Sequence, residues 1–574
     1  MEPPPTKSAH MPLPLSVGWN RWDTLEPPAA ESWVPQEVVT VVVTHYDSIR
    51  SLGLVLAGLA VQTYPPHLLQ IIVADDGSPD LTAVEAAAAA ISEIDAHVLV
   101  QERRGFGAGR ARNMGARAAT GSILIFLDCD MIPEPRLVEA HARWHHAYQD
   151  LVTLGFRLHV RAEPTAEAVL AEGPSNTLAA LFSDCEQVAP AYIEGHMART
   201  DVLTSADDDL FRVLASGNFA LKATTYWRVG GFDESFNQWG GEDTELGYRL
   251  FTDGNVFVPE REAQCWHLGE PGFDDPTKQR SLRDQRALLA HLIAHCGFRR
   301  CLPGRTYARS RVAVLVKGDQ LDGETLQGIV ESVLSQDVHD LTVILQIMPG
   351  HPEARWIERQ LGRDLRVEVQ TGPIPQAPAA SPLIVSLPHG ARLVSGALHA
   401  ILARLCSQED PVGILHITVA GGRPTGDIAW AAHGRALRRG QRFNADDAVA
   451  AAGQLFGELW VGGEDYGVVD MGSVTDPAAP ATVTIDAAAG SRPGAGYAGE
   501  LALVAGAMSR LPARRRTQLI RMAAVAIKAV EKLDAISAAS RVPKLHAHTR
   551  RRIANSLPEP LKRLLRPLWH KINA

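Results

Sequence analysis

Apolar, β-branched runs alternate with amphipathic stretches over the first 130 residues. Residues 38–43 read VVTVVV, and similar apolar runs follow at residues 70–74, 97–101 and 122–127. A continuous apolar run of this length is typical of a strand buried on both faces of a parallel sheet. Helical stretches are expected between the strands, at residues 49–62, 81–94 and 109–120. The alternation predicts an α/β doubly wound, Rossmann-like sheet, in which ligands bind at the carboxyl ends of the strands.

A weak internal repeat indicates that this plan occurs twice. Residues 39–78 and 312–351 both run strand, loop, helix, Gln-containing turn and strand. Residues 381–387 (SPLIVSL) also resemble residues 122–127 (SILIFL). We therefore expect a second α/β domain that begins near Arg309.

Composition changes at both ends of the chain. The Pro-rich N-terminal residues predict a poorly ordered arm, and the Ala/Pro/Gly-rich residues 476–496 predict a linker or long loop. Helical segments are expected after it, at residues 498–508, 517–539 and 560–572. The expected organisation is an arm, a first α/β domain, a second α/β domain, and a linker with a basic helical region, at residues 1–37, 38–305, 306–480 and 481–574.

Charge is distributed unevenly along the chain. Residues 511–574 hold 15 lysine and arginine residues against three acidic ones, a net charge of +12, which leaves −21 on the rest of a chain whose total is −9. The acidic body argues against a general nucleic-acid binder, and the basic tail favours an anionic partner such as a membrane surface or a polyanion. Residues 562–571 mix cations with large apolar side chains, which fits an interfacial amphipathic segment or a helix packed on the second domain.

Six cysteines without a CxxC pair predict a reducing compartment rather than a disulfide framework. There is no apolar run of about 18 residues, so no transmembrane helix is expected. The N-terminus lacks the apolar core of a signal peptide. The expected location is cytoplasmic, with peripheral attachment to the inner face of the cell membrane left open.

Two acidic clusters stand at predicted strand ends. Asp128 and Asp130 are spaced i, i+2, which lets two carboxylates reach one hard divalent cation and a sugar hydroxyl, while a diphosphate supplies further oxygen ligands. Asp76, in the stretch Asp-Asp-Gly-Ser, could accept the N–H of a pyrimidine base, although Asp and Gly are also common turn residues. Either pair taken alone is also compatible with solvated loop acids.

A third cluster, residues 232–243 (FDESFNQWGGED), is more specific. Paired glycines allow the backbone to approach a ligand closely, and Trp239 beside them could stack on a sugar face. Glu242 and Asp243 are expected to open a helix, where acids are favourable, and one of them could be the general base for an attacking hydroxyl. His267 follows a strand-like stretch and could be an imidazole ligand, or a structural histidine.

Taken in order, these motifs resemble the family 2 glycosyltransferases of the GT-A fold. The resemblance rests on Asp-Asp-Gly-Ser, the GxxxARNxG-like residues 107–115 and the LDCD motif. Residues 216–221 (SGNFAL) and the WGGED stretch are similar to the C-terminal half of galactosyltransferase-type enzymes, including bacterial chondroitin-type polymerases and β-1,4-galactosyltransferases. The similarity covers residues 38–269, about 40% of the chain.

The resemblance implies a role for each matching residue. Asp243 would be the general base, with Glu242 and Trp239 holding the acceptor. Asp130 and His267 would bind Mn²⁺ or Mg²⁺. The donor-binding residues would be Thr44, Asp76, Arg112, Asp128, Gly217 and Asn218.

The implied function is an inverting, metal-dependent transfer of a sugar from a nucleotide donor, expected to be a UDP-sugar. The expected acceptor is a cell-surface glycan or a lipid-linked saccharide. Two alternatives remain open, a sugar nucleotidyltransferase and a non-catalytic carbohydrate-binding or scaffold protein. The second domain has Pro388-His389-Gly390 where the first has Asp-Cys-Asp, although Trp460 and residues 461–465 (VGGED) echo the WGGED motif. We expect it to be a degenerate copy that binds acceptor or serves assembly.

Overall fold

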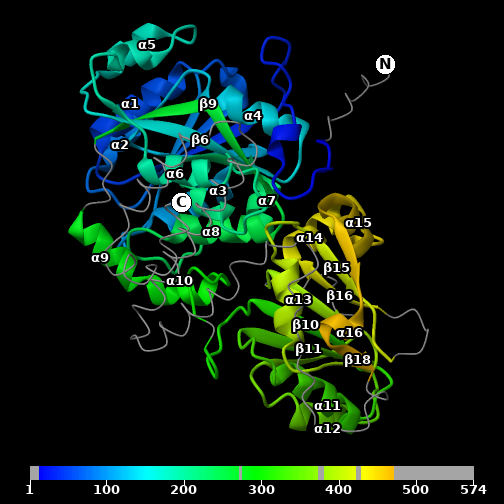
Figure 1. Cartoon of the computed structure of the whole chain (residues 1–574). Coiled ribbons are helices and arrows are strands. Elements are labelled where there is room, and N and C mark those ends of the chain that lie inside the picture. Colours follow the sequence, from blue (N-terminus) through cyan, green and yellow to red (C-terminus); the bar gives the residue numbers. More distant parts are fainter. Residues whose placement is uncertain (1–11, 270–274, 301, 373–380, 422–427, 471–574) are drawn as a thin grey trace, which may run out of the picture. The chain divides into compact units, whose positions relative to one another are not determined.

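Two mixed β-sheets organise the part of the chain that the structure describes (Figure 1). The structure is a computed structural model, and it describes residues 12–269, 275–300, 302–372, 381–421 and 428–470. Both sheets lie within the same compact unit, residues 1–483.

The first sheet has nine strands and is parallel in its first half. Its order is β3 (Asp95–Val100), β2 (Leu69–Asp75), β1 (Val39–His45), β4 (Ile123–Asp128), β8 (Asn218–Lys222), β6 (Leu151–Val160), β9 (Val256–Leu268) and β5 (Met131–Pro133), with β7 (Gln187–Val188) paired to β6. Strands β3, β2, β1 and β4 are parallel, and β8 then runs antiparallel to β4. The four strands predicted from apolar runs are confirmed, with bounds shifted by one or two residues.

Helices cover both faces of this sheet, which makes a three-layer α/β domain. Apolar residues of α1 (Ile49–Ala60), α2 (Leu81–Ala89) and α4 (Leu137–Ala147) pack on one face, which includes Val41 and Val43. Residues of α3 (Ala108–Ala118), α6 (Ala191–Arg199) and α8 (Glu242–Thr252) pack on the other, which includes Val42. Successive residues of β1 thus enter different cores, and this explains why the strand has no solvent-exposed face. Helix α2 ends five residues earlier than predicted, and a turn brings Ile94 back into the core.

The second sheet repeats the order and the strand directions of the first. It runs β12 (Val367–Thr371), β11 (Leu341–Ile347), β10 (Val312–Lys317), β13 (Leu383–Leu387), β16 (Ala429–His433), β15 (Ile414–Ile417) and β17 (Glu458–Val461). Strands β12, β11, β10 and β13 are parallel, β16 is antiparallel to β13, and β17 is parallel to β15. A two-stranded sheet of β14 (Ala391–Leu393) and β18 (Val468–Asp470) lies in the same region. The second α/β plan expected from the repeat is therefore present.

Helices also pack on both faces of the second sheet. Helices α11 (Gly323–Leu334), α12 (Ala354–Gln360) and α13 (Ala397–Leu405) contribute to one core, and α14 (Gly434–Phe443) and α15 (Ala448–Phe456) to the other. Arg439 of α14 is buried, and its guanidinium donates to the carbonyl of Gly254, just past the end of α8, at 2.8 Å. This contact connects the second sheet's helices to the helix that begins with Glu242 and Asp243.

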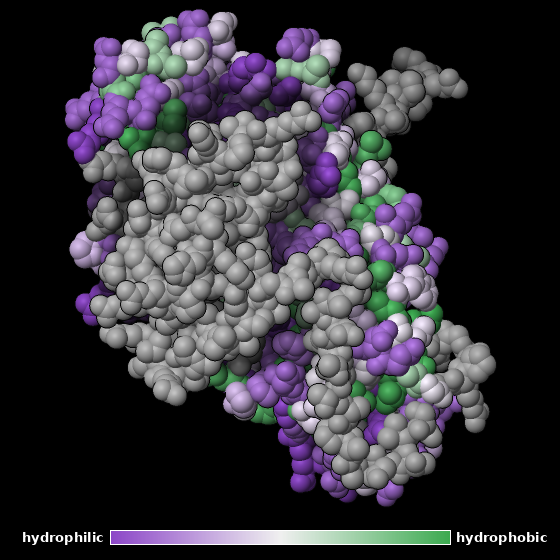
Figure 2. Space-filling view, viewed as in Figure 1, coloured by the Kyte–Doolittle hydropathy of each residue, from purple (hydrophilic) through white to green (hydrophobic). Residues whose placement is uncertain are grey.

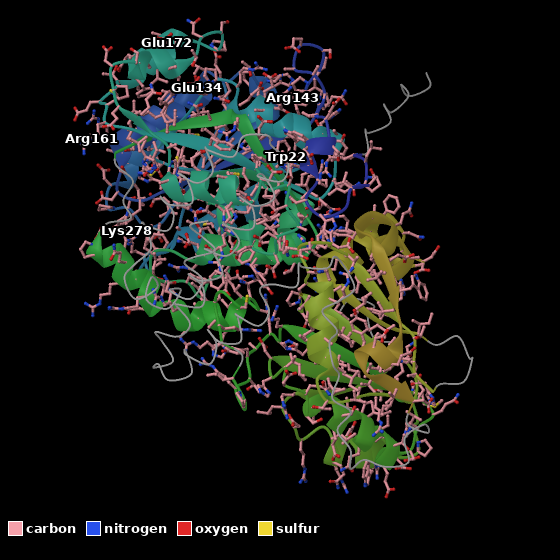
Figure 3. All side chains as sticks on the ribbon, viewed as in Figure 1. Trp22, Glu134, Arg143, Arg161, Glu172 and Lys278 are labelled. Carbon is pink, nitrogen blue, oxygen red and sulfur yellow. The ribbon has the colours of Figure 1, made fainter. Side chains whose placement is uncertain are left out.

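The N-terminal segment corrects one expectation. Residues 12–37 are not a poorly ordered arm, because their side chains are fixed in both halves of the unit. Asn20 is buried and donates its amide to the carbonyls of Leu203 and Phe257 at 2.9 and 2.8 Å, and Trp22, labelled in Figure 3, donates its indole N–H to Val202. Proline richness suggested disorder, but these side-chain contacts with distant residues override it.

The described surface shows no single continuous apolar field on the face seen in Figure 2, where green residues are scattered among purple ones. Within the described ranges, no helix has the length and apolar character needed to cross a membrane. The predicted linker, the helices at 498–508, 517–539 and 560–572, and the basic tail lie outside the described residues.

Candidate active site

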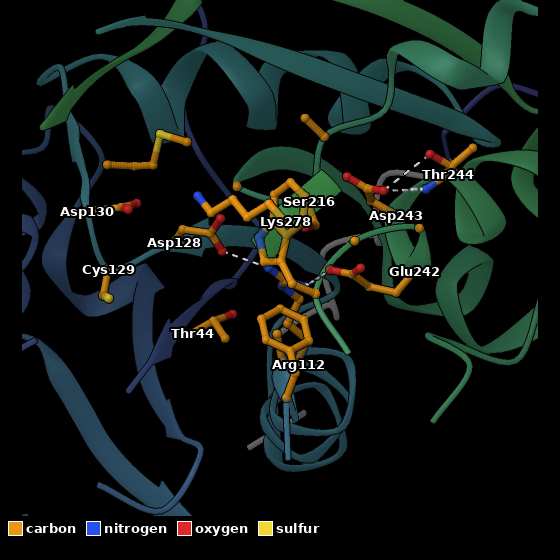
Figure 4. A pocket seen from close by; sticks show the side chains of 18 of the residues that line it. Thr44, Arg112, Asp128, Cys129, Asp130, Ser216, Glu242, Asp243, Thr244 and Lys278 are labelled. Carbon is orange, nitrogen blue, oxygen red and sulfur yellow. Dashed lines mark hydrogen bonds and ion pairs between the residues drawn. The ribbon is translucent and has the colours of Figure 1, made fainter. Parts of the chain in front are cut away.

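A cavity of about 610 Å³ opens at the carboxyl ends of the first sheet's parallel strands. Its size is in the range of small-molecule sites. The predicted residues that line it are Thr44, Asp76, Arg112, Asp128, Asp130, Gly217, Trp239, Glu242, Asp243 and His267. Residues separated by about 200 positions in the sequence therefore share one site (Figure 4).

The two acids at the end of β2 have different environments. Asp75 points inward and ties the turn together, accepting hydrogen bonds from the Ser78 hydroxyl and contacting His45 Nδ1 at 2.7 Å. Asp76 faces the cavity, and its carboxylate already accepts from Arg103, Gln101 and the backbone N–H of Gly107. A base N–H that binds Asp76 must therefore share this carboxylate with Arg103 or displace it.

Arg112 connects the acid at the end of β4 with one of the acids that begin α8. Its buried guanidinium lies 2.7 Å from Asp128 Oδ1 and 3.4 Å from Glu242 Oε1. Phe232 lies under the same guanidinium, 5.1 Å from ring centroid to Cζ. The helix α3 that carries Arg112 thus positions two motifs that lie more than 100 residues apart.

Asp130 and His267 are neighbours at the cavity wall. His267 Nε2 lies 3.5 Å from Asp130 Oδ2, and the other carboxylate oxygen of Asp130 is buried without a hydrogen-bond partner. Burial and the charge of Asp128 raise the pKa of Asp130 to about 7, and burial lowers the pKa of His267 to about 4, which leaves its imidazole neutral at pH 7. The part of the Asp130 side chain that remains accessible opens onto the cavity.

Asp130 and His267 could supply only part of the coordination shell of a divalent cation. No group of three or more His, Cys, Asp or Glu arranged to hold a metal ion is found in the described ranges. The orphaned Asp130 oxygen and the neutral His267 ring are suitable ligands, and remaining positions would have to be filled by a diphosphate and water.

Glu242 and Asp243 begin helix α8, as the sequence predicted. Gly240 and Gly241, with φ of 91° and 94°, turn the backbone into the helix. Burial raises the pKa of both carboxyls, and the negative charge of Asp243 raises the pKa of Glu242 further. A buried carboxylate with a raised pKa is a suitable general base.

Of the adjacent residues Gly217 and Asn218, only Gly217 lines the cavity. A Cβ on Gly217 would lie 2.7 Å from both Asp128 Oδ2 and Met131 Cε, so only glycine leaves Asp128 in place. Asn218 does not line the cavity and lies behind its wall. Its amide donates to the Ala263 carbonyl and its oxygen contacts His141 Nε2 at 3.0 Å, so it ties β8 to β9 and α4.

Several residues at the cavity were not predicted, among them Tyr46, Arg103, Arg157, Tyr192 and Lys278. Arg157 alternates with apolar neighbours on β6, and Lys278 stands in a polar stretch, so neither pattern differs from an ordinary amphipathic strand or helix. Only the tertiary fold distinguishes them from surface charges.

Two family models match this part of the chain. The model described as glycosyl transferase family 2 matches residues 40–184, and the model described as N-terminal domain of galactosyltransferase matches residues 210–262. Both expected resemblances are thereby confirmed. The match and the sheet topology together agree with the GT-A fold.

Curated relatives align with between 42% and 61% of the chain. A validoxylamine A glucosyltransferase of Streptomyces hygroscopicus is 33% identical over 42% of this chain and 53% of its own length. A chondroitin synthase and a hyaluronan synthase of Pasteurella multocida are 27% and 28% identical over 61% of this chain and 37% of theirs. The chain thus spans about half, or less, of the length of these relatives.

Proposed function

Since the chain contains a family 2 glycosyltransferase domain, we propose that it transfers a sugar from a nucleotide donor, a UDP-sugar, to a hydroxyl of a saccharide acceptor with inversion at the anomeric carbon. The observation that carries the proposal is a single cavity that holds both the strand-end acids Asp128 and Asp130 and the helix-opening acids Glu242 and Asp243. A nucleotidyltransferase or a non-catalytic binding protein would not need a half-buried carboxylate placed as a base beside such a site.

The donor occupies the strand-end half of the cavity in this proposal. Thr44 and Asp76 are placed for the nucleotide, and Asp128 for the ribose or the sugar. Asp130 and His267 would hold Mn²⁺ or Mg²⁺, which when bound would offset the negative charge of the diphosphate. Asn218 acts by holding the wall, not by contact with the donor.

Asp243 accepts the proton of the acceptor hydroxyl in the reaction. The hydroxyl oxygen forms the new bond to the anomeric carbon from the face opposite the diphosphate. The bond from that carbon to the diphosphate oxygen breaks, and its electron pair leaves with the nucleoside diphosphate. Glu242, held by Arg112, and the ring of Trp239 orient the acceptor so that its hydroxyl faces the donor sugar.

The acceptor we propose is a cell-surface glycan or a lipid-linked saccharide. Two relatives named as synthases of chondroitin and hyaluronan support a glycan acceptor. In this proposal the second sheet's domain is a degenerate copy without a reaction of its own, and the basic tail attaches the protein to the inner face of the cell membrane.

Nucleotide release from a panel of UDP-, GDP- and dTDP-sugars tests the proposal. Each donor is incubated with Mn²⁺ or with EDTA, beside Asp130→Ala, and binding of the nucleotides is measured by calorimetry on the same samples. We expect slow release from one donor that is lost with EDTA and in Asp130→Ala. If no nucleotide binds with or without metal, the transferase proposal fails.

A further inference from the structure

The cations that line the cavity differ in whether a carboxylate already neutralises them. Arg103 pairs with Asp76, and Arg112 pairs with Asp128 and Glu242. Arg212 pairs with Asp209. Arg157 and Lys278 form no ion pair with a carboxylate of the described residues, so their charges are available to a ligand.

We propose that Arg157 and Lys278 bind the diphosphate of the nucleotide donor and stabilise the charge that develops on it as the sugar leaves. The inference rests on the proposed function and adds two substrate-binding residues to it. Neither residue belongs to the motifs that carry the family resemblance.

Arg157 is held at the wall of the cavity by β6. Its Nη2 donates to the hydroxyl of Tyr192 at 2.8 Å, and a neutral hydroxyl leaves the charge of the guanidinium uncompensated. Its Nε is buried without a hydrogen-bond partner. The guanidinium lines the same cavity as Asp130 and Asp243, and its positive charge favours the ionised form of both carboxyls.

Lys278 reaches the cavity from helix α9 (Pro276–Asp284). Its ammonium lies 5.0 Å from the centre of the Trp239 ring and acts electrostatically on Asp130. Figure 4 shows its side chain among those of Asp128, Ser216 and Asp243.

Hydrogen bonds fix the position of helix α9 relative to the loop that carries Trp239. The Ser281 hydroxyl donates to the Trp239 carbonyl at 2.7 Å. The amide of Gln285, just past the helix, donates to the carbonyls of Trp239 and Gly240 at 2.9 and 2.6 Å. The fold therefore holds the helix that carries Lys278 beside the cavity.

The charge balance of the site calls for these cations. A nucleotide sugar carries about two negative charges on its diphosphate, and about three once the sugar has left. Arg112 is shared between Asp128 and Glu242, so one divalent cation beside Asp130 leaves at most a single positive charge. Arg157 and Lys278 supply two more positive charges in a partly buried cavity, where such interactions are stronger than in water.

Calorimetry with UDP and UMP in the presence of Mn²⁺ tests the proposal on the full chain. The variants are Arg157→Gln and Lys278→Gln, and the matched control is Arg283→Gln, an exposed cation on the same helix whose nearest acid is Asp284. We expect each variant to lose about tenfold in UDP affinity, equivalent to about 1.4 kcal/mol. UMP affinity should fall by less than threefold, and the control should bind both nucleotides as the wild type does.

Charge-conserving variants separate a lost charge from a damaged fold. Arg157→Lys and Lys278→Arg should keep most of the UDP affinity, and all variants should melt near the wild type. Unchanged UDP affinity in both glutamine variants overturns the proposal, and so does an equal loss of UDP and UMP. If the wild type itself binds no nucleoside diphosphate, the failure lies with the proposed function.

Discussion

Asp243, the proposed general base, lies where its ionised form lowers the stability of the fold. It is half-buried beside Glu242, and burial raises its pKa above the ordinary value of 3.8. A raised pKa means that ionisation destabilises the folded state at pH values above the folded pKa. That cost disappears below the ordinary pKa, where the carboxyl is protonated in the folded and unfolded states alike.

We expect Asp243→Asn to reduce transfer or donor hydrolysis by about 10²–10⁴-fold, the range for loss of a general base. The same variant should melt about 1–3 °C higher at pH 8, with the gain shrinking toward pH 4. Initial rates and differential scanning calorimetry at both pH values measure this. If the variant lost activity and also melted well below the wild type at both pH values, Asp243 would have a structural role instead. Asp284→Asn, on exposed α9, is the control.

If Asp130 holds the cation as proposed, metal binding depends on pH. Its pKa is raised to about 7 by burial and by Asp128, and a cation needs the ionised form. Protons therefore compete with the metal as the pH falls through about 7. We expect Mn²⁺ affinity, measured by electron paramagnetic resonance with UDP present, to fall about tenfold from pH 8 to pH 6. Affinity that does not change over this range, or that survives in Asp130→Asn, contradicts the assignment.

Residue types and spacing identified most of the carboxylates at the site, because strand ends and helix starts can be located from the apolar pattern. Asp76, the residue of this pair that the sequence analysis names, lines the cavity, whereas its neighbour Asp75 points inward. Asn218, which the resemblance assigns to the donor pocket, does not line the cavity. Whether a side chain faces the cavity or the wall depends on the neighbouring strand.

At the scale of elements, the loop before α8 determines the positions of Trp239, Glu242 and Asp243, the residues proposed to act on the acceptor. Gly240 adopts a φ of 91°, and a Cβ there would lie 2.7 Å from Leu282 Cδ2 of α9. An L-residue in this conformation costs about 1–2 kcal/mol. The loop, α8 and α9 therefore form one connected structure.

We expect Gly240→Ala to reduce kcat/KM at least tenfold and to lower the melting temperature by about 2–4 °C. The matched control is Gly53→Ala in helix α1, where an added Cβ meets nothing within 4 Å. The control should keep full activity and melt at or above the wild-type temperature, because alanine is favoured over glycine inside a helix. A Gly240→Ala protein with normal kinetics would show that the loop tolerates another path.

Helix α9 shows what the apolar pattern could not predict. Its sequence is polar apart from Pro276 and Leu282 and none of its residues is buried, so no apolar pattern marks it as part of a site. Its function at the cavity comes from Ser281 and the nearby Gln285, whose partners are backbone carbonyls about 40 residues away. Every residue has a backbone carbonyl, so the sequence does not indicate which carbonyls accept these hydrogen bonds.

At the scale of the whole molecule, the two sheets have the same strand order but different residues at the ends of corresponding strands. Asp128 ends β4 of the first sheet, whereas Pro388, His389 and Gly390 follow β13 of the second. Glu464 and Asp465 do stand on the short helix α16 (Gly463–Tyr466), after β17. The proposal that catalysis belongs to the first sheet alone can be tested by treating the two acid pairs alike.

We expect the double variant Glu464→Gln with Asp465→Asn to keep donor turnover within twofold of the wild type. The corresponding double variant Glu242→Gln with Asp243→Asn should lose at least 100-fold, because only that pair shares a cavity with the donor-side acids. Nucleotide release with the donor that the wild type uses measures both. A large loss in the first variant would assign a reaction to the second sheet.

The sequence alone determined the α/β class, the two successive sheets, the strand-end and helix-opening acids, and the family resemblance, because these depend on local periodicity and on motifs read in order. Tertiary structure decided which side chains share the cavity. It also decided that residues 12–37 pack against the body and that Arg157 and Lys278 line the same cavity as Asp130. These properties depend on contacts between residues far apart in the chain, and neither periodicity nor composition records such contacts.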